Sequence, residues 1–460
     1  MARRGSDERG PVRLEYPGKH SERQILRDTP AASLQCSAEH GVVDPGAWSN
    51  MLIHGDNMQV LRRLWADKQA GTLANADGTP GVRLIYIDPP FGTEQDFAGH
   101  RDAPAYSDRR AGAEFIEHLR RRLILLANLL SDDGSIYVHL DEKRSHYIKI
   151  VLDEIFGEQG FQREIIWRIG WVSGFKSKAN NWIRNHDTIL YYSKDPQRFV
   201  FNKSYIPYPE GYRRRDGKQP TGAGVPLEDT WNCSEADSLN SIQIVSFSRE
   251  KTGYPTQKSE ALLDRIIRAS SNPGDLVLDA FCGSGTTCAV AEKTGRRWIG
   301  IDAGKLAIAT TQSRLLRLGR HGPGLPRAFR RYHAVGPDPV GLDVDCAPEA
   351  IWTVETVSGE TEFALQKFQT NAAPERGTTP RSFDGLSAVQ IDFDYREVFR
   401  PGFFALRDDL ERTGYRCRVD PATVGRAVML AAIDVYGNES RSVVKPARGR
   451  SRRSTVKKPG

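Results

Sequence analysis

The sequence lacks the features of a secreted protein, of a protein with a structural zinc site and of a membrane protein. Its six cysteines are scattered and none forms a Cys-x-x-Cys pair, so neither a zinc ribbon nor a disulfide framework organises the chain. No apolar run approaches the length that spans a bilayer, and residues 1–9 carry no hydrophobic segment of the signal-peptide kind. We therefore expect a cytoplasmic protein with no metal site and no membrane partner.

A phosphate-gripping loop is missing as well, because no glycine-rich loop is followed by the Lys of a Walker motif, which argues against a helicase motor. The net charge is +7, from 65 basic and 58 acidic residues. Seven basic and no acidic residues lie within 445–460, so the excess belongs to the tail. We expect residues 446–460 to be disordered, and either to attract nucleic acid unspecifically or to serve solubility alone.

The central feature that is present is an apolar strand ending on an acid. Residues 82–87 are typical of a strand buried on both faces, and Asp88, Pro89, Pro90 and Phe91 follow it. The prolines cannot continue a sheet. The Asp88 carboxylate and the Pro89 carbonyl could hold the two hydrogens of a nucleobase amino group, while Phe91 stacks on a flipped base. An ordinary Pro-Pro turn is the alternative for this motif taken alone.

A second buried strand, 276–279, runs into a glycine loop and then into a helix. No Lys follows Gly285, so the loop does not match an ATP site, and no third glycine completes a dinucleotide fingerprint. Asp302 ends the next strand 19 residues after Gly283, the spacing of an acid that binds a ribose hydroxyl. A ligand with a ribose and no phosphates, such as S-adenosylmethionine, meets this description. A generic glycine turn is the alternative.

Taken together, the two motifs resemble those of the amino-methylating DNA methyltransferases. Asp88-Pro-Pro-Phe91 precedes Asp279-Ala-Phe-Cys-Gly-Ser-Gly-Thr-Thr287, as in the permuted β class, which includes the modification subunits of type III restriction systems. His54-Gly-Asp-Asn57 and Gly253-Tyr-Pro-Thr-Gln-Lys-Ser259 resemble two further segments of that family. Phe91 stands where Tyr is commoner, and Ser259 replaces a usual Pro. The resemblance covers roughly residues 50–320.

This resemblance implies a role for each matching position. The catalytic residues would be Asp88, Pro89, Pro90 and Phe91. The residues that bind S-adenosylmethionine would be Asp56 at the adenine, Thr256 and Lys258 near the methionine carboxylate, Asp279, Phe281, Gly283 and Gly285 in the loop, and Asp302 on the ribose. Because the motif begins with Asp rather than Ser, it is more like the adenine-N6 members than the cytosine-N4 members.

The fold implied is α/β: a circularly permuted, Rossmann-like methyltransferase sheet of about seven strands, with an inserted target-recognition segment and a small C-terminal β-rich domain. Alternating strands and helices from residue 50 onward favour a parallel sheet covered by helices. The expected segments are an irregular arm (1–45), a catalytic half (46–195), the insertion (196–254), a cofactor half (255–325), the β-rich domain (326–445) and the tail (446–460).

We therefore expect a site-specific enzyme that methylates N6 of a flipped adenine in double-stranded DNA. A cytosine-N4 or RNA methyltransferase is one alternative, and a non-catalytic DNA-binding subunit of a restriction or defence complex is another. A restriction subunit is a candidate partner, and a homodimer is compatible with the sequence.

Overall fold

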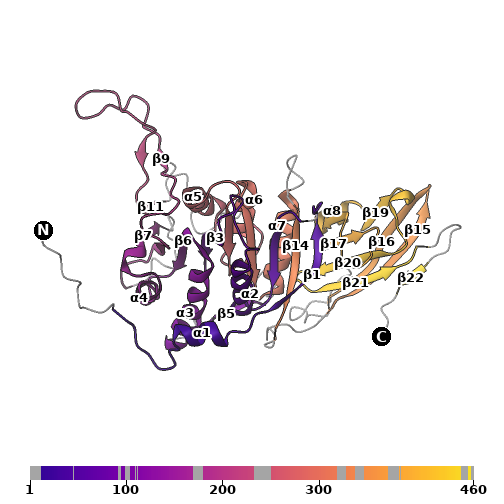
Figure 1. Ribbon diagram of the computed structural model, residues 1–460. Coiled ribbons are helices and arrows are strands. Elements are labelled where there is room, and N and C mark those ends of the chain that lie inside the picture. Colours follow the sequence, from indigo (N-terminus) through magenta and orange to yellow (C-terminus); the bar gives the residue numbers. More distant parts are fainter. Residues whose placement is uncertain are drawn as a thin grey trace.

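The computed structural model describes residues 12–44, 46–91, 95–98, 104–108, 110, 112–168, 180–232, 250–318, 328–336, 347–370, 383, 385–446 and 454–456. Within these residues a ten-stranded sheet forms the centre of the molecule (Figure 1). Its strands, in spatial order, are β1 (Ser33–His40), β14 (Phe329–Val335), β2 (Asn50–His54), β13 (Arg297–Asp302), β12 (Leu276–Asp279), β3 (Val82–Ile87), β6 (Leu130–Leu140), β8 (His186–Ser193), β7 (Phe161–Arg168) and β11 (Thr230–Trp231).

The seven strands from β2 to β7 make up the sheet that the sequence predicts, and β1, β14 and β11 extend it at its two edges. The α/β fold class is therefore confirmed, although the sheet is larger than expected. It is also mixed rather than parallel, because β8 runs antiparallel to both β6 and β7. Strand periodicity alone does not reveal this reversal, since it gives the faces of a strand and not its direction.

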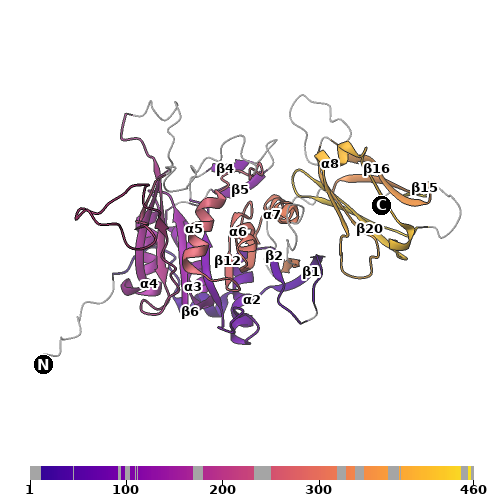
Figure 2. The same ribbon diagram turned by 90° about the horizontal axis from the view of Figure 1, so that it is seen from above.

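Helices cover both faces of the sheet (Figure 2). They are α2 (Asn57–Gln69), α3 (Gly112–Leu129) and α4 (Ser145–Phe156) on one face, and α5 (Glu260–Ser270), α6 (Thr286–Lys293) and α7 (Lys305–Leu318) on the other. The side chains of β3 alternate between two hydrophobic cores. Ile85 and Ile87 pack with the first set of helices, and Leu84 and Tyr86 pack with the second. This double burial explains why the whole of β3 is apolar apart from Arg83.

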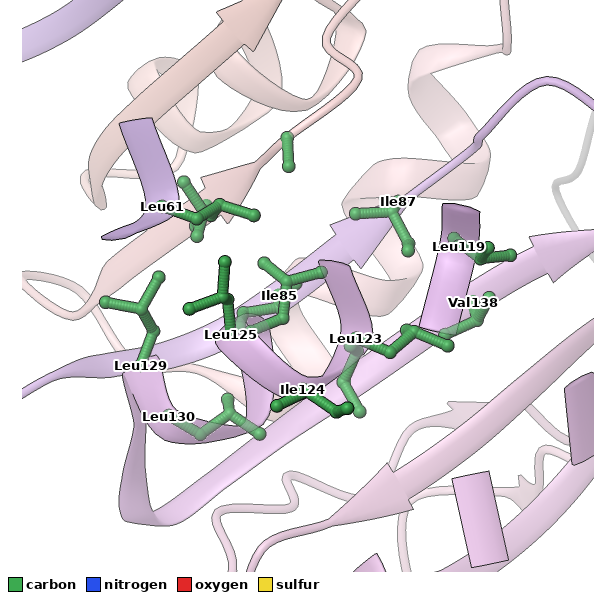
Figure 3. Close-up of a cluster of buried hydrophobic side chains, with 14 of the residues drawn as sticks. Leu61, Ile85, Ile87, Leu119, Leu123, Ile124, Leu125, Leu129, Leu130 and Val138 are labelled. Atoms are coloured by element: carbon green, nitrogen blue, oxygen red, sulfur yellow. The ribbon is translucent and has the colours of Figure 1, made fainter. Parts of the chain in front are cut away.

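The apolar face of α3 forms the densest part of the first core. Leu119, Leu123 and Leu126 are at most 1% exposed, and they recur at helical spacing along α3. Figure 3 shows Leu119 and Leu123 beside Ile87 and Val138, which come from β3 and β6. This packing holds β3 rigidly up to its last residue, from which the Asp88 motif begins.

The N-terminal arm is more ordered than the sequence analysis expects. It contains α1 (Glu22–Asp28), which starts with a capping box between Ser21 and Gln24, and the edge strand β1. Lys19 binds Glu154 of α4 at 2.9 Å, and the Tyr16 hydroxyl donates to Glu117 of α3 at 2.7 Å. These distant partners order the arm, and a local pattern in residues 1–45 cannot indicate them.

Two short hairpins leave the sheet. β4 (Gln95–Ala98) pairs with β5 (Pro104–Asp108) in the stretch after the Asp88 motif, and β9 (Tyr205–Ile206) pairs with β10 (Val225–Pro226) in the expected insertion. The chain between β9 and β10 projects away from the sheet (Figure 1). Single 3₁₀ turns occur at Glu158–Gly160 and Pro421–Thr423.

The described C-terminal residues form a sandwich of two antiparallel sheets, which confirms the predicted β-rich region. One sheet contains, in spatial order, β19 (Arg416–Val419), β16 (Glu360–Gln369), β15 (Glu349–Val357) and β22 (Ser454–Val456). The other sheet contains β18 (Phe403–Leu406), β17 (Leu386–Asp392), β20 (Val428–Asp434) and β21 (Glu439–Val444). The short helix α8 (Arg407–Arg412) directly follows β18. The sandwich starts at β15, because β14 belongs to the large sheet. β22 is a strand within the segment expected to be a disordered tail.

Ion pairs and a small apolar cluster join the sandwich to the edge of the large sheet. Arg400 binds Glu39 of β1 at 2.6 Å, and Arg331 of β14 binds Glu439 of β21. Phe399 packs against Ala38 between these pairs. None of the helices in the described ranges is long and apolar enough to cross a membrane.

The Arg331–Glu439 pair generates a stability prediction. Burial alone would raise the pKa of Glu439, but Arg331 and Arg441 outweigh burial and lower this pKa to about 2. Because that lies below the ordinary value of 4.5, the pair stabilises the fold above about pH 4.5 and its contribution is lost as the pH falls toward 2. We expect Glu439→Gln to lower the free energy of unfolding, measured in urea at pH 7, by on the order of 3 kcal/mol.

The matched control is Glu349→Gln, which removes an exposed ion pair with Lys367 in the same sandwich. Such a pair contributes less than about 1 kcal/mol. The difference between the Glu439 variant and the unmodified chain should shrink as the pH falls from 5 toward 2. Equal losses in both variants at pH 7 would contradict the assignment.

Candidate active site

The Asp88 corner lies at the carboxyl end of β3. Pro89 is buried, whereas Asp88, Pro90 and Phe91 are partly exposed. Oδ2 of Asp88 accepts a charge-assisted hydrogen bond from Nζ of Lys258 at 2.5 Å. Among the residues that the structure describes, no donor reaches the buried Oδ1 of Asp88. A buried acceptor without a partner is costly in a folded protein, so this oxygen is a natural place for an incoming hydrogen-bond donor.

The glycine loop begins directly after β12 and bends sharply before α6. Gly283 and Gly285 have φ values of +48° and +72°, in the left-handed region that favours glycine. A Cβ on Gly285 would lie 2.5 Å from the side chain of Thr311, so only glycine fits there. A Cβ on Gly283 would lie 3.2 Å from the ring of Tyr254. The loop is therefore a tight backbone cradle at the N-terminus of a helix.

Asp279, the last residue of β12, is buried at the base of this cradle. Its carboxylate accepts from the Phe281 N–H at 3.0 Å and from the Thr287 hydroxyl at 2.5 Å. Burial is the largest influence on this group and, with the charges of Asp88 and Asp302, raises the pKa of Asp279 to about 7. A cation bound nearby would relieve this unfavourable concentration of negative charge.

Asp302 closes the cradle from the end of β13. Its two oxygens accept from the N–H groups of Gly283 at 2.8 Å and Gly304 at 2.9 Å. Burial raises the pKa of Asp302, while these backbone donors oppose the rise. Each carboxylate oxygen retains a second lone pair for a ligand hydroxyl. The position fits the predicted ribose contact, which stays a prediction.

The structure brings the two motifs together. β3 and β12 are parallel neighbours, with Ile85 paired to Leu278, so both strands end at the same edge of the sheet. Lys258 connects them directly, because its Nζ binds Asp88 while its carbonyl oxygen accepts from the Thr286 hydroxyl at 3.0 Å. Both motifs therefore lie at one edge of the sheet.

Three other predicted residues lie around this edge with less direct roles. Asp56 caps the N-terminus of α2 and pairs with Arg122 at 3.3 Å, and the neighbouring Gly55 N–H donates to the Asp302 carbonyl at 2.9 Å. Phe281 packs against the first core. Thr256 is exposed and has a φ of +56°, a strained conformation for a β-branched residue. Their contacts to a cofactor stay predictions.

The sequence analysis missed a polar network beneath Phe91. The ring of His139 lies 6.3 Å from that of Phe91, and its two nitrogens contact the Tyr86 hydroxyl at 2.9 Å and Asp187 at 3.1 Å. His139 is 0% exposed, and its buried ring supports Phe91 from below. Arg144 completes the support by donating to the Phe91 carbonyl oxygen at 3.1 Å. These residues come from distant strands and helices, and no short motif marks them.

The two cysteines that flank the loop are buried, and their surroundings fit packing rather than a nucleophilic role. Burial raises the pKa of the Cys282 and Cys288 thiols well above the ordinary range. A Cβ on Gly300 would lie 2.6 Å from the Cys288 sulfur, so the small side chains here serve close packing of β13 against the loop.

Comparison with known proteins agrees with this geometry. The model of a DNA methylase family, N6_N4_Mtase, matches residues 82–313. The type II methyltransferase M.EcaI of Enterobacter cloacae is 30% identical over 66% of this chain and 77% of its own length. The DNA adenine methyltransferase YhdJ of Escherichia coli strain K12 is 29% identical over 56% of this chain and 79% of its own length. The Mod subunit of the type III restriction-modification enzyme StyLTI from Salmonella typhimurium is 24% identical over 60% of this chain and 54% of its own length.

An Asp-Pro-Pro-aromatic corner and a glycine cradle, at the ends of two parallel neighbouring strands, are the features expected of an amino-group methyltransferase. The chain belongs to the N6/N4 DNA methylase family, and the resemblance found in its sequence is confirmed. It is an S-adenosylmethionine-dependent enzyme of this kind.

The cradle generates a prediction about cofactor affinity. Gly285→Ala places a methyl group against Thr311 on a backbone that already has positive φ, so the loop must shift. We expect this variant to bind S-adenosylmethionine at least about tenfold more weakly in calorimetry, which corresponds to about 1.4 kcal/mol of strain. The control, Gly295→Ala, also has a positive φ, +80°, but its Cβ would make only an ordinary contact, 3.7 Å from Cβ of Pro273, and it should bind the cofactor normally. Normal binding by the Gly285 variant would refute the cradle.

Asp279 generates a prediction about pH. Below its pKa of about 7 the carboxyl group is protonated and neutral, and above it the group is a carboxylate that favours a cation. We expect the affinity for S-adenosylmethionine to rise about tenfold between pH 6 and pH 8, in calorimetric titrations. The neutral thioether S-adenosylhomocysteine serves as the control and should rise less. Asp279→Asn should bring the two pH profiles together, and a persisting difference would contradict the role.

Proposed function

We propose that this chain transfers the methyl group of S-adenosylmethionine to N6 of an adenine flipped out of duplex DNA. The observation that carries the proposal is Oδ1 of Asp88, which receives no hydrogen bond from any residue in the described ranges and lies next to Phe91 on the same sheet edge as the glycine cradle. The relative YhdJ is a DNA adenine methyltransferase, which favours adenine over cytosine as the target. The Asp at position 88 favours it as well.

The residues of the chain fit the cofactor. Gly283 and Gly285 leave the backbone open to close approach, and Asp279 supplies a buried negative charge for a cation. Asp302 would hold the ribose and Asp56 the adenine ring, while Thr256, Lys258 and Phe281 would surround the rest. The bound cofactor supplies an electrophilic methyl group on a positively charged sulfur.

The chemistry asked of Asp88 is to activate a poor nucleophile. The lone pair of an exocyclic amino group is delocalised into its ring, and accepting its hydrogens at Oδ1 and at the Pro89 carbonyl draws the nitrogen toward a tetrahedral form. Phe91, supported by His139 and Arg144, would stack on the flipped base. Because the chain holds both reactants at one edge, much of the rate comes from their positioning.

DNA recognition is assigned to the segment 196–254. Its described part carries the exposed Arg213, Arg214 and Arg215 beside the stacked rings of Tyr208 and Tyr212, which are 5.1 Å apart. Cationic and aromatic side chains on a projecting element suit contacts to phosphates and bases. The similarity to a type III Mod subunit supports a restriction subunit as partner. Co-purification would test it, and a homodimer stays a prediction.

Replacing Asp88 with Ala tests the proposal. We expect methyl transfer to fall by roughly 10²-fold or more, because the amino group loses its charged acceptor, while S-adenosylmethionine still binds. Transfer of a tritiated methyl group to DNA measures the first quantity, and calorimetry measures the second. Asp264→Ala, at an exposed ion pair on α5, is the control and should retain activity.

The product decides between the candidate bases. Digesting the methylated DNA to nucleosides and identifying the modified base by mass spectrometry should give N6-methyladenine. N4-methylcytosine would replace the adenine assignment. Full activity in the Asp88 variant would remove the proposed mechanism.

A further inference from the structure

Lys258 spans the two halves of the active site. Its side chain is 8% exposed, and its Nζ lies 2.5 Å from Oδ2 of Asp88 and 5.7 Å from the centre of the Phe91 ring. Its backbone is fixed to the cofactor cradle through the Thr286 hydroxyl. The residue is therefore anchored on the cofactor side, and its charge rests on the side of the base.

The ammonium group occupies the environment that the target amino group needs. It donates to the carboxylate of Asp88 and lies over the face of the same aromatic ring. A charged N–H donor bonds a carboxylate more strongly than a neutral amino group does. The base amino group, which binds at Oδ1 in the proposed function, must therefore share the negative charge of Asp88 with Lys258 at Oδ2.

A second observation separates this arrangement from an ordinary structural ion pair. Of the two Asp88 oxygens, Lys258 satisfies only Oδ2, and within the described part of the chain Oδ1 is buried without a donor. A pair that served stability alone would gain by satisfying both oxygens. The half-satisfied carboxylate suits a site that receives a second donor at Oδ1 while the cation at Oδ2 is able to leave.

The reaction itself changes the charge beside Lys258. During transfer the S–C bond breaks with its electron pair left on sulfur, the methyl carbon bonds to the amino nitrogen, and that nitrogen releases one proton to the surrounding water. The sulfur thus changes from a cation to a neutral thioether. Reacting atoms must lie about 3–3.5 Å apart. The sulfonium would therefore lie close to the amino site, where its positive charge repels the Lys258 ammonium group.

We propose that Lys258 makes capture of the target base depend on the charge of the bound cofactor. With the sulfonium bound, the Lys258 ammonium group leaves Oδ2 and the full charge of Asp88 is available to the amino group at Oδ1, whereas with the neutral thioether Lys258 returns to Oδ2 and weakens the hold on the methylated base. Lys258 is in this sense a positioning residue, which links the order of binding and release to the chemical step. This inference rests on the proposed function.

The test compares DNA affinities at equilibrium, with the whole chain and without turnover. The recognition site is first identified by sequencing DNA that the enzyme has methylated. Fluorescence anisotropy then measures how tightly a labelled, unmethylated duplex with this site binds to protein saturated with one of two cofactor analogues. Sinefungin carries an ammonium group in place of the methylsulfonium, and S-adenosylhomocysteine carries the neutral thioether. We expect the unmodified chain to bind DNA at least about tenfold more tightly with sinefungin, because only the charged analogue displaces Lys258.

Variants and a second duplex isolate the Lys258 contribution. Lys258→Met should bind the duplex with similar affinity, within about twofold, in the presence of either analogue, whereas Lys258→Arg should keep the preference for sinefungin. A duplex with purine, which lacks the amino group, in place of the target adenine should show little preference even with the unmodified chain. A sinefungin preference that survives in Lys258→Met, or that is missing from the unmodified chain, would overturn the inference.

The outcome also separates this inference from the proposed function. If the unmodified chain places a tritiated methyl group on adenine but binds DNA equally with both analogues, only the role of Lys258 fails. If no methyl group reaches adenine, the proposed function fails, and the inference that rests on it fails too. Circular dichroism of both Lys258 variants checks that they fold.

Discussion

The parallel pairing of β3 with β12 is the constraint on which the active site depends. The two strands lie in the middle of the sheet, buried on both faces, and they end side by side. Asp88 and Asp279 are therefore held close together by rigid strands, although 191 positions separate them in the chain. A methyl transfer needs its donor and acceptor held within a bond-forming distance, and strand pairing provides that precision better than a loop could.

Electrostatics then makes the edge selective for a cation. Asp88, Asp279 and Asp302 meet at one place, and burial raises the pKa of Asp279 and of Asp302. Such a concentration of carboxylates is unfavourable alone, and Lys258 offsets part of it through Asp88. The charge of the site is thus balanced between internal neutralisation by Lys258 and an incoming positive charge.

Local motifs made much of this site predictable from the sequence. Asp88 and Phe91 are predictable because they adjoin two prolines that cannot continue a strand. The two loop glycines are predictable because they directly follow another buried strand. Both signals lie in adjacent positions of the sequence. The supporting residues do not have this property. His139, Asp187 and Arg144 reach Phe91 only after β6, β8 and α4 are in place. The direction of β8 and the order of the N-terminal arm likewise depend on partners far along the chain. The ion pair between Lys258 and Asp88 is a tertiary contact of the same kind.

The pairing of β1 with β14 has a consequence for how such enzymes arise. β1 precedes the methyltransferase sheet and β14 follows it, yet the two strands are hydrogen-bonded neighbours at one margin. The chain therefore enters and leaves the domain at adjacent points. Ends that lie together can be fused, and the chain reopened elsewhere, with little disturbance of the interior. A gene rearrangement could thus shuffle the order of the catalytic and cofactor motifs while their meeting place in space is preserved.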